Sequence, residues 1–551
     1  MDFNLTALHE AIAAEHPERT CIIQGDRRLS YADVDSRSRR LASALAANGV
    51  GLSRERAQLA NHESGQDHVA LYLQSCPEYL EGMLGAMKAR AAPFNVNHRY
   101  VAEELAYVLN DAAPKVAIYH DEFASTLADV LPGLPSIELL VQVTDSTGAD
   151  LLPGAIRYDD FISGTGTSPS DIEPSGDDLY MLYTGGTTGM PKGVLWRQHD
   201  VFVAAMGGRP WGQSAPFDDI DSVVAASANG GARMMTAAPL MHGAAQWLAF
   251  TAFTGGNTVV LPADPGRFDP AAIWSTVEQE KVLTLQIVGD AFGRPLVDEL
   301  DRHDYDLSNF MVLSNGGAAL GPTTKERLLE RLPNLMLIDA IGSSETGGQM
   351  GNTSTATSGA QVSFAPGPGT VVVDDSMSAV LEPGGDTTGW LAQSGNVPLG
   401  YLGDADKTAR TFPTIDGIRY AIPGDRAIIR ADGDIEFRGR ESATINTGGE
   451  KVFAEEVERS LLNHRSVLDV MVVGRPSERW GSEVVAIVEL ADDIDDAELL
   501  ETASRHLARY KLPKAIIRKD RLRRSPAGKA DYRWAASVAA ADAEATVSAG
   551  E

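Results

Sequence analysis

The chain has 551 residues, of which 43% are apolar and 22% are charged, values that are typical of globular proteins and that exclude a fibrous or disordered chain. So long a chain exceeds what one hydrophobic core usually supports, so we expect at least two domains. The formal net charge of −29 argues against a nucleic acid partner, because no stretch rich in Lys and Arg offsets it locally. Small anions remain possible ligands, since they respond to a focused cationic site.

Two features indicate the cellular compartment. Cys21 and Cys76 are the only cysteines, which suits a reducing environment without a disulfide framework. No run approaches the roughly 18 apolar residues of a membrane span, and the start lacks the basic and apolar regions of a secretory signal. We therefore expect a cytoplasmic protein without an integral membrane segment.

In chain order, the first elements alternate between helix and strand. Residues 8–47 predict a helix, a short strand at 20–23, a turn at Gly25 and a second amphipathic helix that begins near Ser30. Later apolar runs predict buried strands between helical segments, at 116–119, 258–261 and 335–338. Such a pattern favours mixed sheets covered by helices, so the predicted fold class is α/β.

The last quarter of the chain predicts a second body. A hairpin-like turn at 432–440 closes the first body, and a helix at 455–462 followed by a strand at 467–474 opens the next. We expect a large N-terminal domain at 1–440 and a small, mobile α+β lid domain at 441–537. Residues 538–551 are alanine-rich and acidic without an apolar period, so we expect a disordered tail there.

The segment 184–193, directly after an apolar run, predicts a phosphate-binding loop. Glycine lets backbone N–H groups converge on phosphate oxygens, threonine hydroxyls add donors, and Lys192 adds charge. Pro191 and Gly193 around this lysine exclude a Walker A loop. A flexible surface loop is the alternative for any glycine-rich segment, but ten specific positions together argue against it. The other residues that we assign to phosphate binding are Thr184, Gly185, Gly186, Thr187 and Thr188.

This loop resembles the signature of the adenylate-forming superfamily, which includes acyl-CoA synthetases, adenylation domains and luciferases. The segment 341–346 is similar to the second signature of that family. The resemblance implies that Glu345 ligates Mg²⁺ and that Ser344 touches a nucleotide phosphate; a hard cation does prefer carboxylate oxygen. The family usually has an aromatic residue where this chain has Ile341, whose aliphatic side chain can still cover the adenine ring.

Further segments extend the resemblance across the nucleotide. Residues 313–319 are similar to the glycine-rich turn that flanks the adenine and the acyl group. Asp425 matches the acid that accepts hydrogen bonds from the ribose hydroxyls, and Arg440 matches the arginine that closes on the nucleotide; taken singly, a turn cap and a surface ion pair are commoner roles. The other nucleotide residues implied by the resemblance are Gly316, Gly317, Ala318, Asp339, Gly342 and Ser343.

Two C-terminal segments resemble the parts that the family exchanges by domain rotation. Residues 526–532 are similar to the signature whose lysine, here Lys529, bridges the attacking carboxylate and the α-phosphate. Residues 447–458 resemble the lining of the pantetheine tunnel in CoA ligases. The family's hinge, usually Asp or Lys, corresponds to Ser442, and its usual proline to Ala454. The tunnel residues implied are Gly448, Gly449, Glu450 and Lys451.

His242 matches an aromatic position at the mouth of the family's acyl pocket, where it would gate the approach of carboxylate and thiol; a buried structural histidine is the alternative. Segments such as 95–100 and 288–292 are most similar to ligases for fatty acids and for steroid or diterpenoid acids. We therefore expect a bulky hydrophobic acid. The acyl-pocket residues implied, besides His242, are Met241, Val288, Gly289 and Gly316.

The resemblance implies an AMP-forming acid–thiol ligase. A carboxylic acid and ATP, with Mg²⁺, would give acyl-AMP and pyrophosphate, and CoA would then give acyl-CoA and AMP. A homodimer is one possible assembly. Two alternatives stay open: an adenylating enzyme that loads a separate acyl carrier protein, and a non-catalytic nucleotide-binding regulator. Retention of Lys192, Glu345 and Lys529 argues against the regulator.

Overall fold

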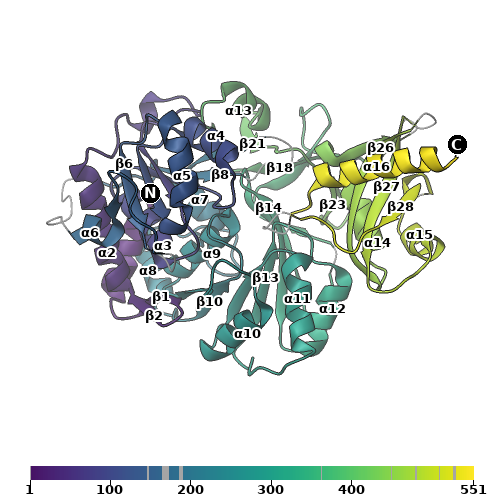
Figure 1. Ribbon diagram of the computed structural model, residues 1–551, viewed down its shortest axis with the longest axis horizontal. Coiled ribbons are helices and arrows are strands. Elements are labelled where there is room, and N and C mark those ends of the chain that lie inside the picture. The colour runs from purple at the N-terminus through teal and green to yellow at the C-terminus, as the bar shows by residue number, and fades with distance from the viewer. Residues whose placement is uncertain are drawn as a thin grey trace.

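The computed structural model describes residues 2–144, 148–163, 173–184, 190–361, 363–447, 450–477, 481–507, 509–524 and 529–550. Helices and mixed sheets form a large N-terminal body, drawn from purple to green in Figure 1, with a smaller C-terminal body in yellow-green beside it. The predicted α/β class is confirmed. Among the described residues, no helix has the length and apolar character needed to cross a bilayer.

The first large sheet has nine strands in the described part of the chain. Its central strands are parallel, while β15 and β2 run antiparallel to their inner neighbours. The carboxyl ends of the parallel strands therefore lie along one edge, where open α/β sheets bind ligands. In spatial order the strands are β16 (Ala365–Pro366), β15 (Gly347–Ser354), β14 (Met336–Ser343), β13 (Val312–Gly316), β12 (Thr284–Ile287), β10 (Arg233–Thr236), β11 (Thr258–Leu261), β1 (Thr20–Gln24) and β2 (Arg27–Ser30).

The second large sheet carries the predicted phosphate loop. Its strands are parallel except at one end, where β9 runs antiparallel to β8 and β19 runs antiparallel to β9. In spatial order the strands are β19 (Gly400–Tyr401), β9 (Gly193–Arg197), β8 (Leu179–Tyr183), β4 (Ala92–Asn95), β3 (His68–Tyr72), β5 (Val116–His120), β6 (Leu139–Val143) and β7 (Ile156–Arg157).

Smaller sheets complete both bodies. A third sheet lies between the two large sheets and the C-terminal body in Figure 1. It contains β20 (Thr414–Ile415), β21 (Ile418–Ala421), β18 (Gly389–Ser394), β22 (Asp425–Ile429), β23 (Ile435–Arg440) and β17 (Thr370–Val373). The C-terminal body contains the hairpin β24 (Thr444–Thr447) and β25 (Glu450–Phe453), and the sheet β26 (Val467–Ser477), β27 (Gly481–Leu490) and β28 (Ala515–Arg518).

The helices begin and end at recognisable local signals. Ser30 caps α2 by accepting a hydrogen bond from the backbone N–H of Asp33, while the Asp33 side chain returns a bond to the cap. The helices are α1 (Leu5–Glu15), α2 (Tyr31–Ala47), α3 (Pro77–Lys88), α4 (Ala102–Ala112), α5 (Ala124–Val130), α6 (Tyr158–Ser163), α7 (Gln198–Ala205), α8 (Ile220–Ser227), α9 (Gly243–Thr254), α10 (Pro270–Gln279), α11 (Asp290–Leu300), α12 (Pro322–Arg331), α13 (Ala405–Thr411), α14 (Ala454–Leu461), α15 (Asp496–Ser504) and α16 (Tyr532–Gly550).

One continuous core unites the two large sheets. It contains Ile22 and Val259 of the first sheet, Leu71 and Tyr180 of the second, and apolar side chains of the helices between them. Burial at roughly 25 cal/mol per Å² makes such a shared core the main stabilising term of the large body. The two sheets therefore hold their strand ends in a fixed relation to each other.

The C-terminal tail differs from the expectation. Instead of a disordered segment from residue 538, the structure has helix α16, which packs on β26. Ala535 and Ala539 are 0% and 1% exposed and lie in a core cluster with Met471 and Ile487. Alanine is the best helix former, and its small side chain allows close packing on a sheet, so an apolar stripe of larger residues is not required.

Candidate active site

The predicted phosphate loop joins two antiparallel strands. Tyr183 of β8 pairs with Gly193 of β9, and the backbone N–H of Thr184 donates a 3.1 Å hydrogen bond to the carbonyl oxygen of Lys192. This closes the base of the loop and brings its first and last residues together. Four predicted residues of the loop, Gly185, Gly186, Thr187 and Thr188, lie outside the described residues.

Lys192 lies at the end of this loop and forms an ion pair with Asp404. Both side chains are 31% exposed, so the pair is accessible to water and can be opened by a competing anion. The ring of Tyr401, on the neighbouring strand β19, lies 5.9 Å from the Lys192 ammonium and 4.6 Å from that of Lys407. A cluster of two lysines over an aromatic face suits a polyanionic ligand.

Glu345 lies in the tight turn between β14 and β15. The hydroxyl of Tyr401 donates a 2.8 Å hydrogen bond to Oε1 of Glu345, and the indole N–H of Trp196 donates to the carbonyl oxygen of Ser344 at 2.9 Å. Inside the turn, the hydroxyl of Thr346 accepts from the backbone N–H of Ser343 at 3.0 Å. The turn is thereby tied to both β9 and β19, next to the phosphate loop.

Gly342 and Ile341 precede this turn. A Cβ atom on Gly342 would lie 2.1 Å from the carbonyl oxygen of Gly347, so the two strands approach too closely for any other residue. Ile341 is partly buried against a small apolar cluster that contains Met350. Its side chain is therefore supported by the sheet, as a residue that covers an adenine ring would need to be.

Asp425 and Arg440 face each other across β22 and β23. They are register partners, and Nε of Arg440 donates to Oδ1 of Asp425 at 3.2 Å. Asp425 is 5% exposed, and burial raises its pKa, with the nearby Glu345 acting in the same direction and Arg440 opposing it. The carboxylate of Asp425 is thus buried, held by one cation, and close to the turn that carries Glu345.

Lys529 reaches the same cluster from the C-terminal body. Burial lowers its pKa, the Arg440 guanidinium lowers it further, and the Glu345 carboxylate opposes both. The pKa of His242 is lowered to about 3, first by burial and then by the Lys529 ammonium. Lys529 is therefore close enough to Arg440, Glu345 and His242 to interact with them electrostatically, although they are far apart in sequence.

His242 precedes α9 at its N-cap position, and its backbone N–H donates to the carbonyl oxygen of Pro239 at 3.0 Å. Its Nε2 atom has no hydrogen-bond partner among the described residues. The adjacent Met241 is buried, and its carbonyl oxygen accepts from Nδ2 of Asn95 at 2.7 Å. Asn95 also bonds the backbone of Tyr183, at 2.7 Å and 2.9 Å, so one amide fixes both the histidine turn and the start of the phosphate loop.

The remaining predicted pocket residues follow neighbouring strands. Val288 and Gly289 follow β12, while Gly316 ends β13 and is followed by Gly317 and Ala318. Gly289 and Gly317 have φ angles of +60° and +84°, which only glycine adopts readily. These segments form adjacent turns at the carboxyl edge of the first sheet.

Asp339, predicted to bind the nucleotide, has buried partners instead of an exposed carboxylate. It is 7% exposed, its Oδ2 pairs with Nζ of Lys325 at 2.7 Å, and its Oδ1 accepts from Nδ2 of Asn315 at 2.7 Å. Its side chain is therefore turned into the protein, and strand β14 beyond it carries the residues that face the other clusters.

The structure describes part of the predicted CoA segment and the backbone of the predicted hinge. Glu450 and Lys451 belong to β25, where they pair with Thr447 and Asn446 of β24. Ser442 lies in a short 3₁₀ turn, Glu441–Ala443, between β23 and β24. Gly448 and Gly449 lie outside the described residues.

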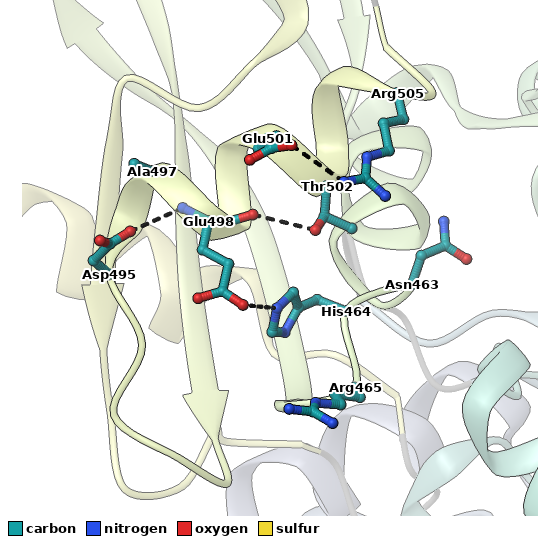
Figure 2. A pocket seen from close by; sticks show the side chains of 9 residues that line it. All are labelled: Asn463, His464, Arg465, Asp495, Ala497, Glu498, Glu501, Thr502 and Arg505. Carbon is teal, nitrogen blue, oxygen red and sulfur yellow. Dashed lines mark hydrogen bonds and ion pairs between the residues drawn. The ribbon is translucent and has the colours of Figure 1, made fainter.

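Figure 2 shows a separate pocket on the C-terminal body, between the residues that follow α14 and one face of α15 from its N-cap to its C-cap. Its walls are polar: Nε2 of His464 lies 3.1 Å from Oε1 of Glu498, and Arg505 pairs with Glu501 at 3.2 Å. None of its nine lining residues was predicted to bind nucleotide, acid or CoA. This pocket is therefore not part of the candidate active site.

Sequence reasoning missed several residues that shape the site. Tyr401 and Asp404 contact predicted residues only because β19 pairs with β9, a pairing between segments about 200 residues apart that no local pattern indicates. Asn315 lies inside the segment 313–319 but was not singled out, and Trp196 was not predicted to contribute.

A family model described as AMP-binding enzyme matches residues 9–402, and one described as AMP-binding enzyme C-terminal domain matches residues 456–529. The medium-chain acyl-CoA ligase Mig of Mycobacterium avium is 51% identical to this chain over 536 residues, which cover 97% of this chain and 98% of that protein. A medium/long-chain-fatty-acid–CoA/3-oxocholest-4-en-26-oate–CoA ligase of Mycobacterium marinum is 39% identical and covers 96% of both proteins.

Among solved structures, the anthranilate CoA ligase AuaEII in complex with anthranoyl-AMP superposes with a TM-score of 0.81 over 98% of both chains. The sequence identity is 21%, so this likeness concerns the fold.

Proposed function

The chain belongs to the AMP-binding enzyme family and is an AMP-forming acid–CoA ligase, and on this premise we propose which residues carry out the reaction and which acids it uses. The observations that carry the proposal are the hydrogen bond from Tyr401, whose ring lies beside Lys192, to Glu345, and the electrostatic influence of Glu345 on both Asp425 and Lys529. Segments of both the large body and the C-terminal body contribute these residues.

In the first half-reaction, a carboxylate oxygen of the acid attacks the α-phosphorus of ATP, the bond to the β-phosphate oxygen breaks, and pyrophosphate leaves. We assign Lys192 and the phosphate loop to the β- and γ-phosphates, and Asp425 to the ribose hydroxyls. Lys529 lies between the reacting anions in this proposal, where an ammonium lowers their repulsion in the transition state. Desolvation makes its charge more effective there, because a low dielectric strengthens the attraction.

We assign Mg²⁺ to Glu345. The described residues contain no group of three or more metal-ligating side chains, which fits a cation held by one carboxylate, substrate phosphates and water. The hydrogen bond from Tyr401 fixes the carboxylate that would face it. When bound, the ion neutralises charge on the triphosphate.

In the second half-reaction, the thiol of CoA attacks the acyl carbon, AMP leaves, and the thiol proton passes to solvent. We propose that rotation about Ser442 withdraws Lys529 and brings the segment Glu450–Phe453 to the acyl group. An acyl carrier protein is the alternative acceptor. Incubation of enzyme, acid and ATP with either CoA or a carrier protein, followed by mass spectrometry of the thioester, distinguishes the two.

We propose a hydrophobic acid of medium or greater length as the substrate. The names of the relatives from M. avium and M. marinum support this size class, and Gly316 and Gly317 have no side chain to fill the space beside their turn. A series of saturated acids from acetate to palmitate, together with a steroid side-chain acid, tests it. The proposal fails if acetate has the highest kcat/KM.

Two expectations remain predictions. Size-exclusion chromatography with light scattering tests the expected homodimer, and cell fractionation tests the expected cytoplasmic location. The non-catalytic regulator is excluded if the purified protein releases pyrophosphate from ATP only when an acid is present.

A further inference from the structure

The side chain of Asn315 joins three segments of the candidate active site. It lies on β13 and is 1% exposed. Its Oδ1 atom accepts a hydrogen bond from the backbone N–H of Gly289 at 2.6 Å. Its Nδ2 atom donates to the carbonyl oxygen of Ala318 at 3.0 Å and to Oδ1 of Asp339 at 2.7 Å. Both amide donors and the carbonyl acceptor are therefore in use.

The three partners come from different parts of the site. Gly289 follows β12 in the proposed acid pocket, and Ala318 lies in the turn that flanks acid and adenine. Asp339 lies on β14, the strand that leads to Glu345. Only Asn and Gln offer two donors and an acceptor on one planar group, and the distance between adjacent strands, about 4.8 Å, suits the shorter of the two.

Asp339 is held firmly on its other side. Nζ of Lys325 lies 2.7 Å from Oδ2 of Asp339, and it also donates to the carbonyl oxygen of Gln361 at 3.1 Å. The side chains of Lys325 and Asp339 are 4% and 9% exposed, so water does not compete for these bonds. Asp339, the hydrogen-bond partner of Asn315 on the nucleotide strand, is therefore fixed in place.

Gly289 is equally constrained on the acid side. Its φ angle is +60°, and a Cβ atom there would lie 2.6 Å from the carbonyl oxygen of Ala319 and 2.8 Å from Cβ of Ala318. The next residue, Asp290, donates its backbone N–H to that same carbonyl of Ala319 at 3.0 Å. The turns that follow β12 and β13 are therefore packed tightly against each other, and the amide of Asn315 connects both of them to β14.

We propose that Asn315 is a positioning residue for adenylate formation: it sets the acid pocket against the nucleotide strand without contacting either substrate. This inference rests on the proposed ligase function. Loss of the amide leaves each half of the site intact, so each substrate still binds alone. The two reacting atoms are then misaligned, and a displacement of about 1 Å lowers a rate by about 100-fold.

The first test compares Asn315→Ala with the matched variant Asn4→Ala. Asn4 is also buried, at 4% exposed, and its amide also makes several hydrogen bonds, but it caps α1. With octanoate as the acid, ATP–pyrophosphate exchange in Asn315→Ala is expected to show a kcat about 100-fold lower, with the KM values of octanoate and ATP within about 3-fold of wild type. Asn4→Ala is expected to lose thermal stability with kcat unchanged. A kcat of Asn315→Ala within 3-fold of wild type, or an equal loss in Asn4→Ala, overturns the proposal.

A second variant, Asn315→Asp, keeps the shape of the side chain. The new carboxyl faces Asp339 and the paired Lys325, and the like charge of Asp339 favours its protonated form, whose O–H can donate to Asp339 as the amide does. The ratio of variant to wild-type kcat is expected to rise as the pH falls from about 8.5 to about 6. A ratio that does not change with pH contradicts a coupling through Asp339. If wild type itself shows no exchange with octanoate, the proposed function fails; if wild type is active and the variants match it, only this inference fails.

Discussion

The hydroxyl of Tyr401 donates a 2.8 Å hydrogen bond to Oε1 of Glu345. The bond links β19, beside the phosphate loop, to the turn after β14, and so connects the two large sheets at the candidate active site. Burial raises the pKa of Tyr401 far above its usual value, and Glu345 raises it further, so the phenol stays protonated and remains a donor.

Tyr401→Phe is therefore expected to lower the kcat of adenylation about 10-fold and to raise the Mg²⁺ concentration required for half-maximal rate, because partners of a metal ligand typically contribute 10- to 100-fold. ATP–pyrophosphate exchange measured against Mg²⁺ concentration checks this. Tyr305→Phe is the matched control, since Tyr305 donates a 2.8 Å bond to Glu299 away from the site. An unchanged Mg²⁺ dependence in Tyr401→Phe would count against the role of Glu345.

Lys529→Ala is expected to abolish adenylation and to leave thioester formation from supplied acyl-AMP within about 10-fold of wild type. The reason is that the ammonium is needed only while two anions approach each other. Single-turnover assays of each half-reaction give the comparison, and Lys519→Ala, an exposed lysine of the same domain, is the control. Equal loss of both half-reactions would show that Lys529 has another role.

Asp404→Asn is expected to lower the KM for ATP about 3-fold. Asp404 pairs with Lys192 in this structure, and a partly exposed pair of this kind is worth about 0.5–1 kcal/mol, which ATP must displace. Asparagine removes the charge but preserves the N-cap of α13, where Asp404 accepts from the backbone N–H of Lys407. Initial rates against ATP concentration measure the effect, with Asp406→Asn as the control. A higher KM would mean that Asp404 orients Lys192 for ATP.

The burial of His9 is expected to make the folded protein less stable in acid. It is 1% exposed, neither ring nitrogen has a hydrogen-bond partner among the described residues, and its pKa is lowered to about 3 by burial and by Lys88. The unfolded chain binds a proton near pH 6.5, so stability falls as the pH drops from about 6.5 towards 3.

At pH 5 the protonation of His9 in the unfolded chain lowers the free energy of unfolding by about 2 kcal/mol relative to pH 7.5. His9→Phe keeps the aromatic contacts with Phe253 and removes the titration. Its melting temperature is expected to fall less than that of wild type between these two pH values, whereas the exposed control His506→Phe is expected to follow wild type. Identical pH dependence in His9→Phe and wild type would refute the assignment.

Local patterns predicted much of the fold correctly. The cap at Ser30 and the buried strands at 116–119 and 258–261 were expected and are present, because capping chemistry and apolar runs act within a few residues. At the tail from residue 538 the structure has helix α16 where we expected disorder. This helix depends on packing against β26, and a run of alanines gives no apolar period that reports such a contact.

The sequence by itself determined the chemistry that is available: a glycine- and threonine-rich loop with Lys192, an acid at Glu345 and a lysine at Lys529. The tertiary structure decided how these groups meet and what holds them. Asp404, Tyr401 and Asn315 became part of the site through strand pairings between distant segments. The physical reason is range: propensity and periodicity are local properties of a chain, whereas a hydrogen bond or ion pair across two sheets depends on the packing of the whole core.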